Sequence, residues 1–184
     1  MSSPDGPRSP GVAHRPSAEA GRASAELTRL VGVLWPGVEV DVSIAPLACI
    51  GIVGQPKSLV EVRRLLQRWA AHTGLAAVQV ADVVLASYEA LANAVEHAYP
   101  SGGGTVDLLA VGTADGRVLI TVRDHGRWRP PPRDTGSRGR GLSMIKALAH
   151  RAEVQPGPHG TCVQMEWQLS ATVSAVTRRR GEAG

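Results

Sequence analysis

The spacing of apolar residues divides the chain into helical and extended segments. Apolar residues three and four apart line one face of a helix, whereas short runs of β-branched and aliphatic residues are typical of strands. The helical spacing covers residues 25–34, 58–72, 78–99 and 142–149. The extended pattern covers residues 38–44, 48–53, 105–113, 117–123, 152–155 and 161–169. Helices on one face of a mixed, mostly antiparallel sheet predict an α+β fold, a two-layer α/β sandwich.

Turn and capping residues indicate where some of these elements begin and end. Ser58, followed three residues later by Glu61, is typical of a capping box at the start of a helix. Asp115 and Gly116 between two extended segments are typical of a hairpin turn. The loop of proline, arginine and glycine at residues 125–140 is longer than an ordinary connection, which favours a lid or a binding loop.

Composition and charge limit the classes of function. The chain has 184 residues, 43% of them hydrophobic, which suits one packed domain with tails. The net charge of +4 is too small to indicate nucleic-acid binding by itself, and the basic segments lack interleaved aromatic residues. Cys49 and Cys162 lie far apart in apolar runs, so we expect buried thiols and no metal cluster.

The chain is expected to contain one folded domain, at residues 47–170. Residues 1–24 are rich in proline, glycine, serine and alanine and are expected to be disordered. Residues 25–46 form an N-terminal extension, and residues 171–184 a basic C-terminal tail. No apolar run is long enough for a membrane span and no secretory signal is recognised, so we expect a cytoplasmic protein without membrane contacts.

A polar stripe interrupts the longest helical segment. Glu89, Asn93 and His97 stand four residues apart and therefore share one helix face, although asparagine is a poor residue for a helix interior. Such a stripe is usually a solvated face, and that interpretation stays open here. In a functional interpretation Glu89 is a general base and the Asn93 amide oxygen a ligand of Mg²⁺. A Mg²⁺-bound nucleotide would then require a phosphate-binding element elsewhere.

Three glycine-containing segments are candidates for that element. They are residues 123–126 at the end of a strand, residues 136–141 before a helix, and residues 159–161 at the start of the last strand. Glycines before a helix bring backbone N–H groups close to phosphate. The sequence has neither a P-loop nor a dinucleotide-binding fingerprint. Taken singly, each segment could equally be an ordinary surface loop or turn.

Together with the stripe, these segments resemble the Bergerat-fold (GHKL) ATPase superfamily. EALANAVEHAYP, residues 89–100, is similar to its N box, and DHG, GRGLSMI and HGT are similar to its three glycine boxes. The N box most resembles that of the anti-sigma-factor serine/threonine kinases of bacterial partner-switching systems. The resemblance covers about residues 47–169 and implies a Bergerat fold with a histidine-kinase-like ATP-binding domain.

The resemblance implies a role for each matching residue. Glu89 would be the catalytic base, and Asn93 would bind Mg²⁺ together with the nucleotide. Asp124 would accept a hydrogen bond from the adenine amino group, and Gly126 would let the ring approach closely. The nucleotide-binding residues implied by the other boxes are Gly139, Gly141, Leu142 and Thr161.

The implied function is that of an ATP- and Mg²⁺-dependent protein serine/threonine kinase. It would bind a sigma factor and phosphorylate a STAS-type anti-sigma-factor antagonist, without direct nucleic-acid contact; a homodimer is one open alternative for its assembly. Neither a complete histidine kinase nor a gyrase-like enzyme is expected. Arg127 and Trp128 stand where the family's first glycine box often has its second glycine. This departure favours an alternative, a nucleotide-responsive binding module without productive kinase activity.

Overall fold

The computed structural model describes most of the chain in two units. The described residues are 26–27, 29–99, 103–126 and 140–169. The chain divides into two compact units, residues 1–36 and residues 37–184. In the first unit residues 29–34 are helical, and the Trp35 N–H donates a 2.7 Å hydrogen bond to the Val31 carbonyl.

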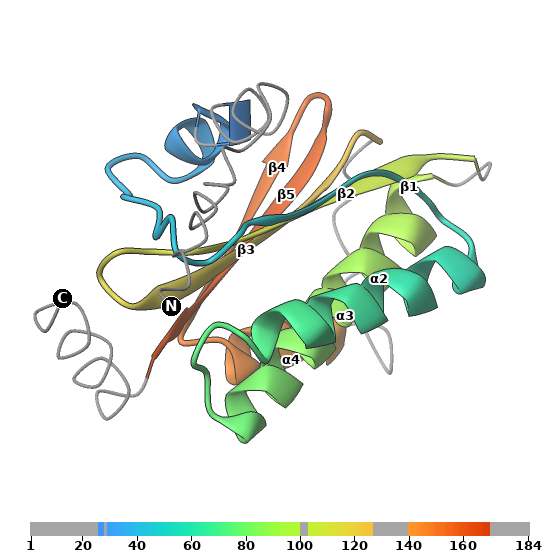
Figure 1. The fold of residues 1–184 in the computed structure, drawn as a ribbon. Helices are drawn as coiled ribbons and strands as arrows, with labels where there is room; N and C mark the ends of the chain where they lie inside the picture. Colours follow the sequence, from blue (N-terminus) through green and yellow to red (C-terminus); the bar gives the residue numbers. More distant parts are fainter. Residues whose placement is uncertain (1–25, 28, 100–102, 127–139, 170–184) are drawn as a thin grey trace, which may run out of the picture. The chain divides into compact units, whose positions relative to one another are not determined.

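The second unit contains a five-stranded sheet with the order β1-β2-β3-β5-β4 (Figure 1). Its strands are β1 (Leu47–Val53), β2 (Thr105–Gly112), β3 (Arg117–Asp124), β4 (Arg151–Gly157) and β5 (Gly160–Gln168). Each of the four pairs of neighbouring strands is antiparallel. Two of these pairs, β2–β3 and β4–β5, are hairpins with short connections, whereas α2 and α3 lie between β1 and β2, and α4 and β4 lie between β3 and β5.

Three helices cover one face of this sheet (Figure 1). They are α2 (Pro56–Ala70), α3 (Ala77–Ala98) and α4 (Arg140–Leu148). The expected α+β fold with two layers is therefore confirmed. α3 is the central helix, because it contacts α2, α4 and the strands β2, β3 and β5.

The core lies between the sheet and the helices. Alternate residues of a strand point to opposite faces, and those of β2, β3 and β5 that face the helices are almost completely buried. These residues are Val106, Leu108, Ala110, Val118, Ile120, Val122, Val163, Met165 and Trp167. From α2 the buried residues Leu59, Val62 and Leu66 follow the expected helical spacing. The same spacing on α3 leaves its remaining face available for polar side chains.

The expected capping box at Ser58 is wrong. α2 begins two residues earlier, with Pro56 in the first turn after the N-cap residue Gln55, and no side chain caps it. Proline suits this position because its ring fixes a helical φ and its missing N–H would have had no partner within the helix.

The strand expected at residues 38–44 is also wrong. Only a single bridge forms there, between Val40 and Thr113. The Asp41 carboxylate accepts hydrogen bonds from the Ser43 N–H and hydroxyl, at 2.8 and 2.6 Å. An aspartate that bonds the backbone two residues on makes a turn, and this turn ends the extended run.

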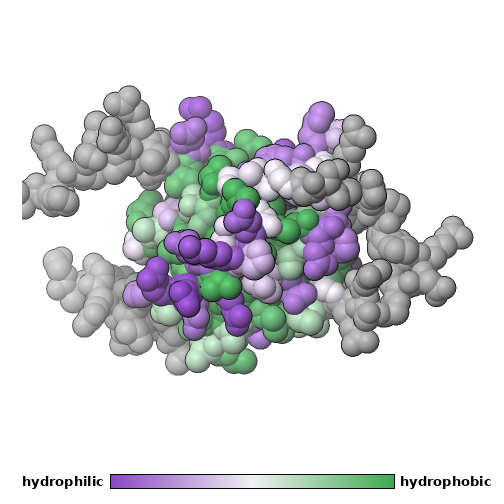
Figure 2. Space-filling model, turned by 90° about the vertical axis from the view of Figure 1, so that its right-hand side faces the viewer, coloured by the Kyte–Doolittle hydropathy of each residue, from purple (hydrophilic) through white to green (hydrophobic). Residues whose placement is uncertain are grey.

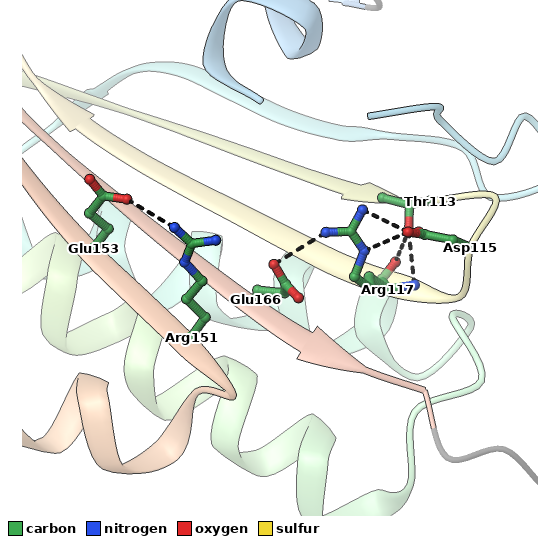
Figure 3. Close-up of polar contacts among 6 residues, drawn as sticks. All are labelled: Thr113, Asp115, Arg117, Arg151, Glu153 and Glu166. Atoms are coloured by element: carbon green, nitrogen blue, oxygen red, sulfur yellow. Dashed lines mark hydrogen bonds and ion pairs between the residues drawn. The ribbon is translucent and has the colours of Figure 1, made fainter. Parts of the chain in front are cut away.

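A polar cluster fixes the hairpin between β2 and β3 (Figure 3). The turn at Asp115 and Gly116 is confirmed, and Gly116 has a φ of +81°. The Arg117 Nε and Nη2 atoms donate to Asp115 Oδ2 at 2.9 and 2.7 Å, and Nη1 lies 3.3 Å from Glu166 Oε2 on β5. These hydrogen bonds from Arg117, together with one from Thr113, hold the pKa of the Asp115 carboxyl below its usual value. Arg117 thus links the turn to the neighbouring strand.

Among the residues shown in colour in Figure 2, hydrophilic and hydrophobic residues are interspersed on the surface. Single exposed apolar side chains are normal on protein surfaces. Across the part of the chain that the structure describes, no helix combines the length and the apolar character needed to cross a membrane.

Removal of the Arg117 side chain is expected to destabilise the domain. The Glu166 side chain is only 9% exposed, so its charge would lose a partner in a poorly solvated position. Leaving a buried polar group without its partner costs about 1–3 kcal/mol. Arg117→Ala should therefore lower the free energy of unfolding by about 2 kcal/mol in urea denaturation at pH 7.

Arg151→Ala is the matched control, because it removes an arginine from an ion pair on β4 whose side chains are 70% and 51% exposed. It should cost less than about 0.5 kcal/mol. Because the pKa of Asp115 is lowered in the folded state, the stabilisation from its pair with Arg117 is present above about pH 4 and is lost as the pH falls through the lowered pKa. Equal costs of Arg117→Ala and Arg151→Ala at pH 7 would contradict this assignment.

Candidate functional site

The polar stripe of α3 lies at the edge of its buried face. Glu89 and Asn93 are one turn apart, and both are half-buried, whereas His97 in the next turn is exposed. The adjoining buried face carries alanines at a four-residue spacing, at positions 86, 90, 94 and 98. Small side chains let neighbouring elements approach the helix closely. Glu89 and Asn93 therefore differ from a fully solvated helix face.

The first turn of α4 approaches both polar residues. A Cβ atom built on Gly141 would lie 2.8 Å from Asn93 Nδ2 and 3.3 Å from Glu89 Oε2. Only a residue without a side chain fits at this distance unless its neighbours move. The structure therefore brings Glu89, Asn93 and Gly141 together at the N-terminal end of α4.

Asp124 and Gly126 lie at the end of β3. The Asp124 side chain belongs to a residue that is only 4% exposed, and its Oδ1 atom accepts a 3.0 Å hydrogen bond from the Gly126 N–H. Gly126 contacts the end of α3: a Cβ atom there would lie 2.7 Å from Ala98 Cβ and would overlap the Ala98 carbonyl. Close contact with α3 thus requires a glycine at this position as well.

Thr161 is placed beside Asp124 by the register of the sheet. β3 and β5 are paired so that Arg123 lies opposite Cys162, which brings Asp124 level with Thr161. Thr161 is buried, and Gly160, with a φ of +123°, lies directly against the Asp124 backbone. Two strands therefore fix the position of the buried carboxylate.

The two glycine contacts place both groups of residues along one helix. Gly141 approaches α3 at Asn93 and Gly126 approaches it at Ala98, five residues further on. At 1.5 Å per residue this is about 7.5 Å along the helix axis. One nucleotide can span such a distance, so the two groups form a single candidate site.

The residues of this site fit a nucleotide with its Mg²⁺. The buried carboxylate of Asp124 is an acceptor for an amino group, and Gly126 beside it lets the chain pack directly against the Ala98 end of α3. The amide oxygen of Asn93 is a hard donor of the kind that Mg²⁺ prefers, and the Glu89 carboxylate stands one helical turn away. They lie next to a helix N-terminus, whose N–H groups and dipole favour an anionic phosphate.

Some of the expected site residues lie outside the described residues, and one of the described ones could contact a nucleotide only through its backbone. Gly139, Arg127 and Trp128 lie outside the described residues, as do the expected tails. Leu142 packs its partly buried side chain against the core, so only its backbone is a candidate for phosphate contact.

Sequence reasoning missed Tyr99 and Ala98 as parts of the site's frame. The Tyr99 hydroxyl donates a 2.5 Å hydrogen bond to the Thr105 carbonyl and accepts one of 2.8 Å from the His125 N–H. The position of Tyr99, directly after the helix and before Pro100, was the available signal.

A family model and several solved structures match large parts of this chain. The model of the histidine kinase-like ATPase domain family matches residues 52–167, a range that contains all the described site residues. A similar solved structure is that of the RsbU and RsbW domains of Rv1364c from Mycobacterium tuberculosis, with 29% identity and a TM-score of 0.56. The match covers 67% of this chain and 32% of that one, so this chain spans about a third of its length.

A second structure, the SiaB–SiaC complex from Pseudomonas aeruginosa, has 12% identity and a TM-score of 0.51, with 80% of this chain and 99% of that chain covered. This likeness concerns the fold alone. The family match extends over more than half of the chain and includes the N box and the described parts of the glycine boxes. The resemblance to Bergerat-fold ATPases is thereby confirmed, and the chain belongs to the family of histidine kinase-like ATPase domains.

Proposed function

We propose that this protein is an ATP- and Mg²⁺-dependent protein serine/threonine kinase that acts as an anti-sigma factor. The observation that carries the proposal is the close approach of Gly141 to Asn93 and Glu89, where a Cβ atom would lie 2.8 and 3.3 Å from their side chains. It brings an amide that would bind the metal, a carboxylate and a helix N-terminus into one site, which are groups that phosphoryl transfer uses. A cytoplasmic location, as expected from the sequence, would give the kinase access to ATP.

The nucleotide would be oriented by residues at both ends of the site. Asp124 would accept a hydrogen bond from the adenine amino group, and Thr161 would support the base through water. Gly126 would let the ring approach the loop closely. The backbone of Gly139, Gly141 and Leu142 would bind the phosphates, and Asn93 would hold Mg²⁺. The metal ion, when bound, neutralises phosphate charge that develops during transfer.

Glu89 would act as the general base. Its carboxylate takes the proton from a serine or threonine hydroxyl of the substrate while that oxygen attacks the γ-phosphorus, and ADP leaves. The bond formed joins the substrate oxygen to phosphorus, and the bond broken joins phosphorus to the β–γ bridging oxygen. Proximity of base, phosphate and hydroxyl supplies most of the rate gain in such a reaction.

The proposed partners are a sigma factor and a STAS-type antagonist that receives the phosphate. Support comes from the structural relatives: RsbU and RsbW domains occur together in Rv1364c, and SiaB was solved in complex with SiaC. In the first relative two domains are therefore present together, and in the second two proteins.

A nucleotide-responsive binding module without productive transfer is the second candidate. Arg127 and Trp128 favour it, because bulky residues replace a glycine in the first glycine box. In this alternative ATP would change the affinity for a partner without phosphorylating it.

Asp124→Asn is expected to weaken Mg²⁺-ATP binding. A neutral amide is a poorer acceptor than a carboxylate, and charge-assisted hydrogen bonds are roughly twice as strong as neutral ones. We expect a loss of about tenfold, equivalent to about 1.4 kcal/mol, in isothermal calorimetry. Glu153→Gln, which removes an exposed carboxylate from β4, should leave binding unchanged. Wild-type protein that binds no ATP in the presence of Mg²⁺ would rule out the proposed site.

Glu89→Gln separates the two candidate functions. It preserves shape but removes basicity, so phosphate transfer to an antagonist should fall by roughly 10² to 10⁴-fold. ATP affinity should stay within about threefold, because a base contributes mainly to the transition state. Transfer of ³²P from labelled ATP measures the rate, and Glu61→Gln on the exposed face of α2 is the control.

Two results would count against the kinase. If Glu89→Gln transfers phosphate at the wild-type rate, Glu89 is not the base. If the wild type transfers none to any antagonist, while ATP alters its binding of a partner, the binding module is the correct function.

A further inference from the structure

The carboxylate of Asp107 joins three separate parts of the domain. Its Oδ1 atom accepts a 2.8 Å hydrogen bond from the Gly51 N–H on β1, and its Oδ2 atom lies 2.8 Å from Nε2 of His125. Gly51, with a φ of +69°, lies where the pairing of β1 with β2 shifts register. One side chain on β2 therefore links an irregular point of the edge strand to the loop that follows β3.

Asp107 and Asp124 lie on opposite faces of the sheet. Val106 is buried with the residues that face the helices, so its neighbour Asp107 points to the other face. Asp124 is paired with Val106 and is buried on the helix side. The Asp107–His125 contact thus holds the loop from the face opposite the candidate nucleotide site.

His125 is fixed through its backbone as well as its side chain. Its N–H donates a 2.8 Å hydrogen bond to the Tyr99 hydroxyl, which in turn donates to the Thr105 carbonyl. Its imidazole is 45% exposed, whereas the side chain of Asp107 is 24% exposed. Nothing in the proposed chemistry uses this imidazole, although His125 stands in the sequence between the two residues that would meet the adenine ring.

We propose that His125 and Asp107 are positioning residues that set the selectivity of the site for adenine over guanine nucleotides. The inference rests on the proposed function, in which Asp124 and Gly126 meet the base. Asp124 distinguishes an amino group, which donates, from the guanine carbonyl, which cannot. That distinction requires a fixed carboxylate and a fixed loop, because a polar contact loses its value when its geometry relaxes.

Loss of the contact should affect the base more than the phosphates. The loop with Asp124 and Gly126 would be freed on one side, whereas Gly141 and Asn93 meet at a different part of α3 and would keep their arrangement. ATP binding should therefore weaken while GTP binding, which gains little from Asp124, stays nearly constant. The ratio of the two affinities is the property that the contact controls.

The test compares Mg²⁺-ATP and Mg²⁺-GTP affinities by calorimetry in the full chain. We expect His125→Ala and Asp107→Ala each to weaken ATP binding by about fivefold to twentyfold and GTP binding by less than threefold, a loss in the range of one side-chain hydrogen bond. The variant with both substitutions should bind ATP no more weakly than the more impaired of the two single variants, because each substitution already removes the same contact.

Two further variants distinguish positioning from general destabilisation. His125→Gln keeps an N–H donor for the carboxylate and should restore most of the selectivity. Glu153→Ala removes an exposed carboxylate on β4, remote from the loop, and should change neither affinity. His125→Ala leaves the bond between Asp107 and Gly51 untouched, so the inference is testable even if Asp107→Ala fails to fold.

The results separate this inference from the proposed function. If the wild type prefers ATP and His125→Ala has the same ratio of ATP to GTP affinity, the positioning role is refuted while the proposed function stands. This holds whether the two affinities are unchanged or equally weakened. If the wild type binds neither nucleotide, both the proposed function and this inference fail.

Discussion

The close approach of α4 to α3 is the constraint on which the candidate site depends. Gly141 has no side chain there, and a methyl group would lie within 3.3 Å of the side-chain ends of both Asn93 and Glu89, which would have to shift. The approach brings the N-terminal end of α4 next to a carboxylate and an amide. A carboxylate near this end of a helix is favoured by the helix dipole, and so is an added anionic phosphate. The same contact thus stabilises the packing and creates the binding surface.

α3 meets two demands that conflict in most helices. One face must be buried against the sheet, and it carries leucine, valine and regularly spaced alanine. The edge of that face carries Glu89 and Asn93, half-buried and therefore costly to place there unless they are used. Asparagine also lowers the helix propensity. The proposed binding role of Asn93 would explain why the helix accepts both costs. The two ends of β3 also differ. One end carries the ion cluster around Arg117, and the other end carries the buried Asp124.

The periodic parts of the fold could be predicted from the sequence, and the irregular parts could not. The α+β class, all three helices of the second unit and all five strands follow from apolar spacing and turn residues. The start of α2 was misplaced because Pro56 outweighs the capping signal of Ser58. Residues 38–44 look like a strand, but the bond from Asp41 to Ser43 produces a turn that the apolar pattern does not reveal.

The site itself was predictable as a set of motifs and not as a geometry. Asn93 stands out because asparagine is a poor residue for a helix interior, Glu89 because it shares the same helix face, and the glycine segments because they lie next to the ends of strands and helices. The link between Asp107 and His125 was not predictable, since it depends on the register of the β2–β3 hairpin, in which Asp107 lies opposite Arg123, and on the path of the chain after β3. Contacts of that kind depend on tertiary register, which a single-strand pattern does not contain.

The most direct measurement is a crystal structure of the protein with Mg²⁺ and a non-hydrolysable ATP analogue. The account predicts one nucleotide along α3, with the adenine amino group on the Asp124 carboxylate, the phosphates at the first turn of α4, and the metal ion bound by Asn93. A nucleotide bound elsewhere on the protein, or a metal ion that Asn93 does not touch, would contradict it.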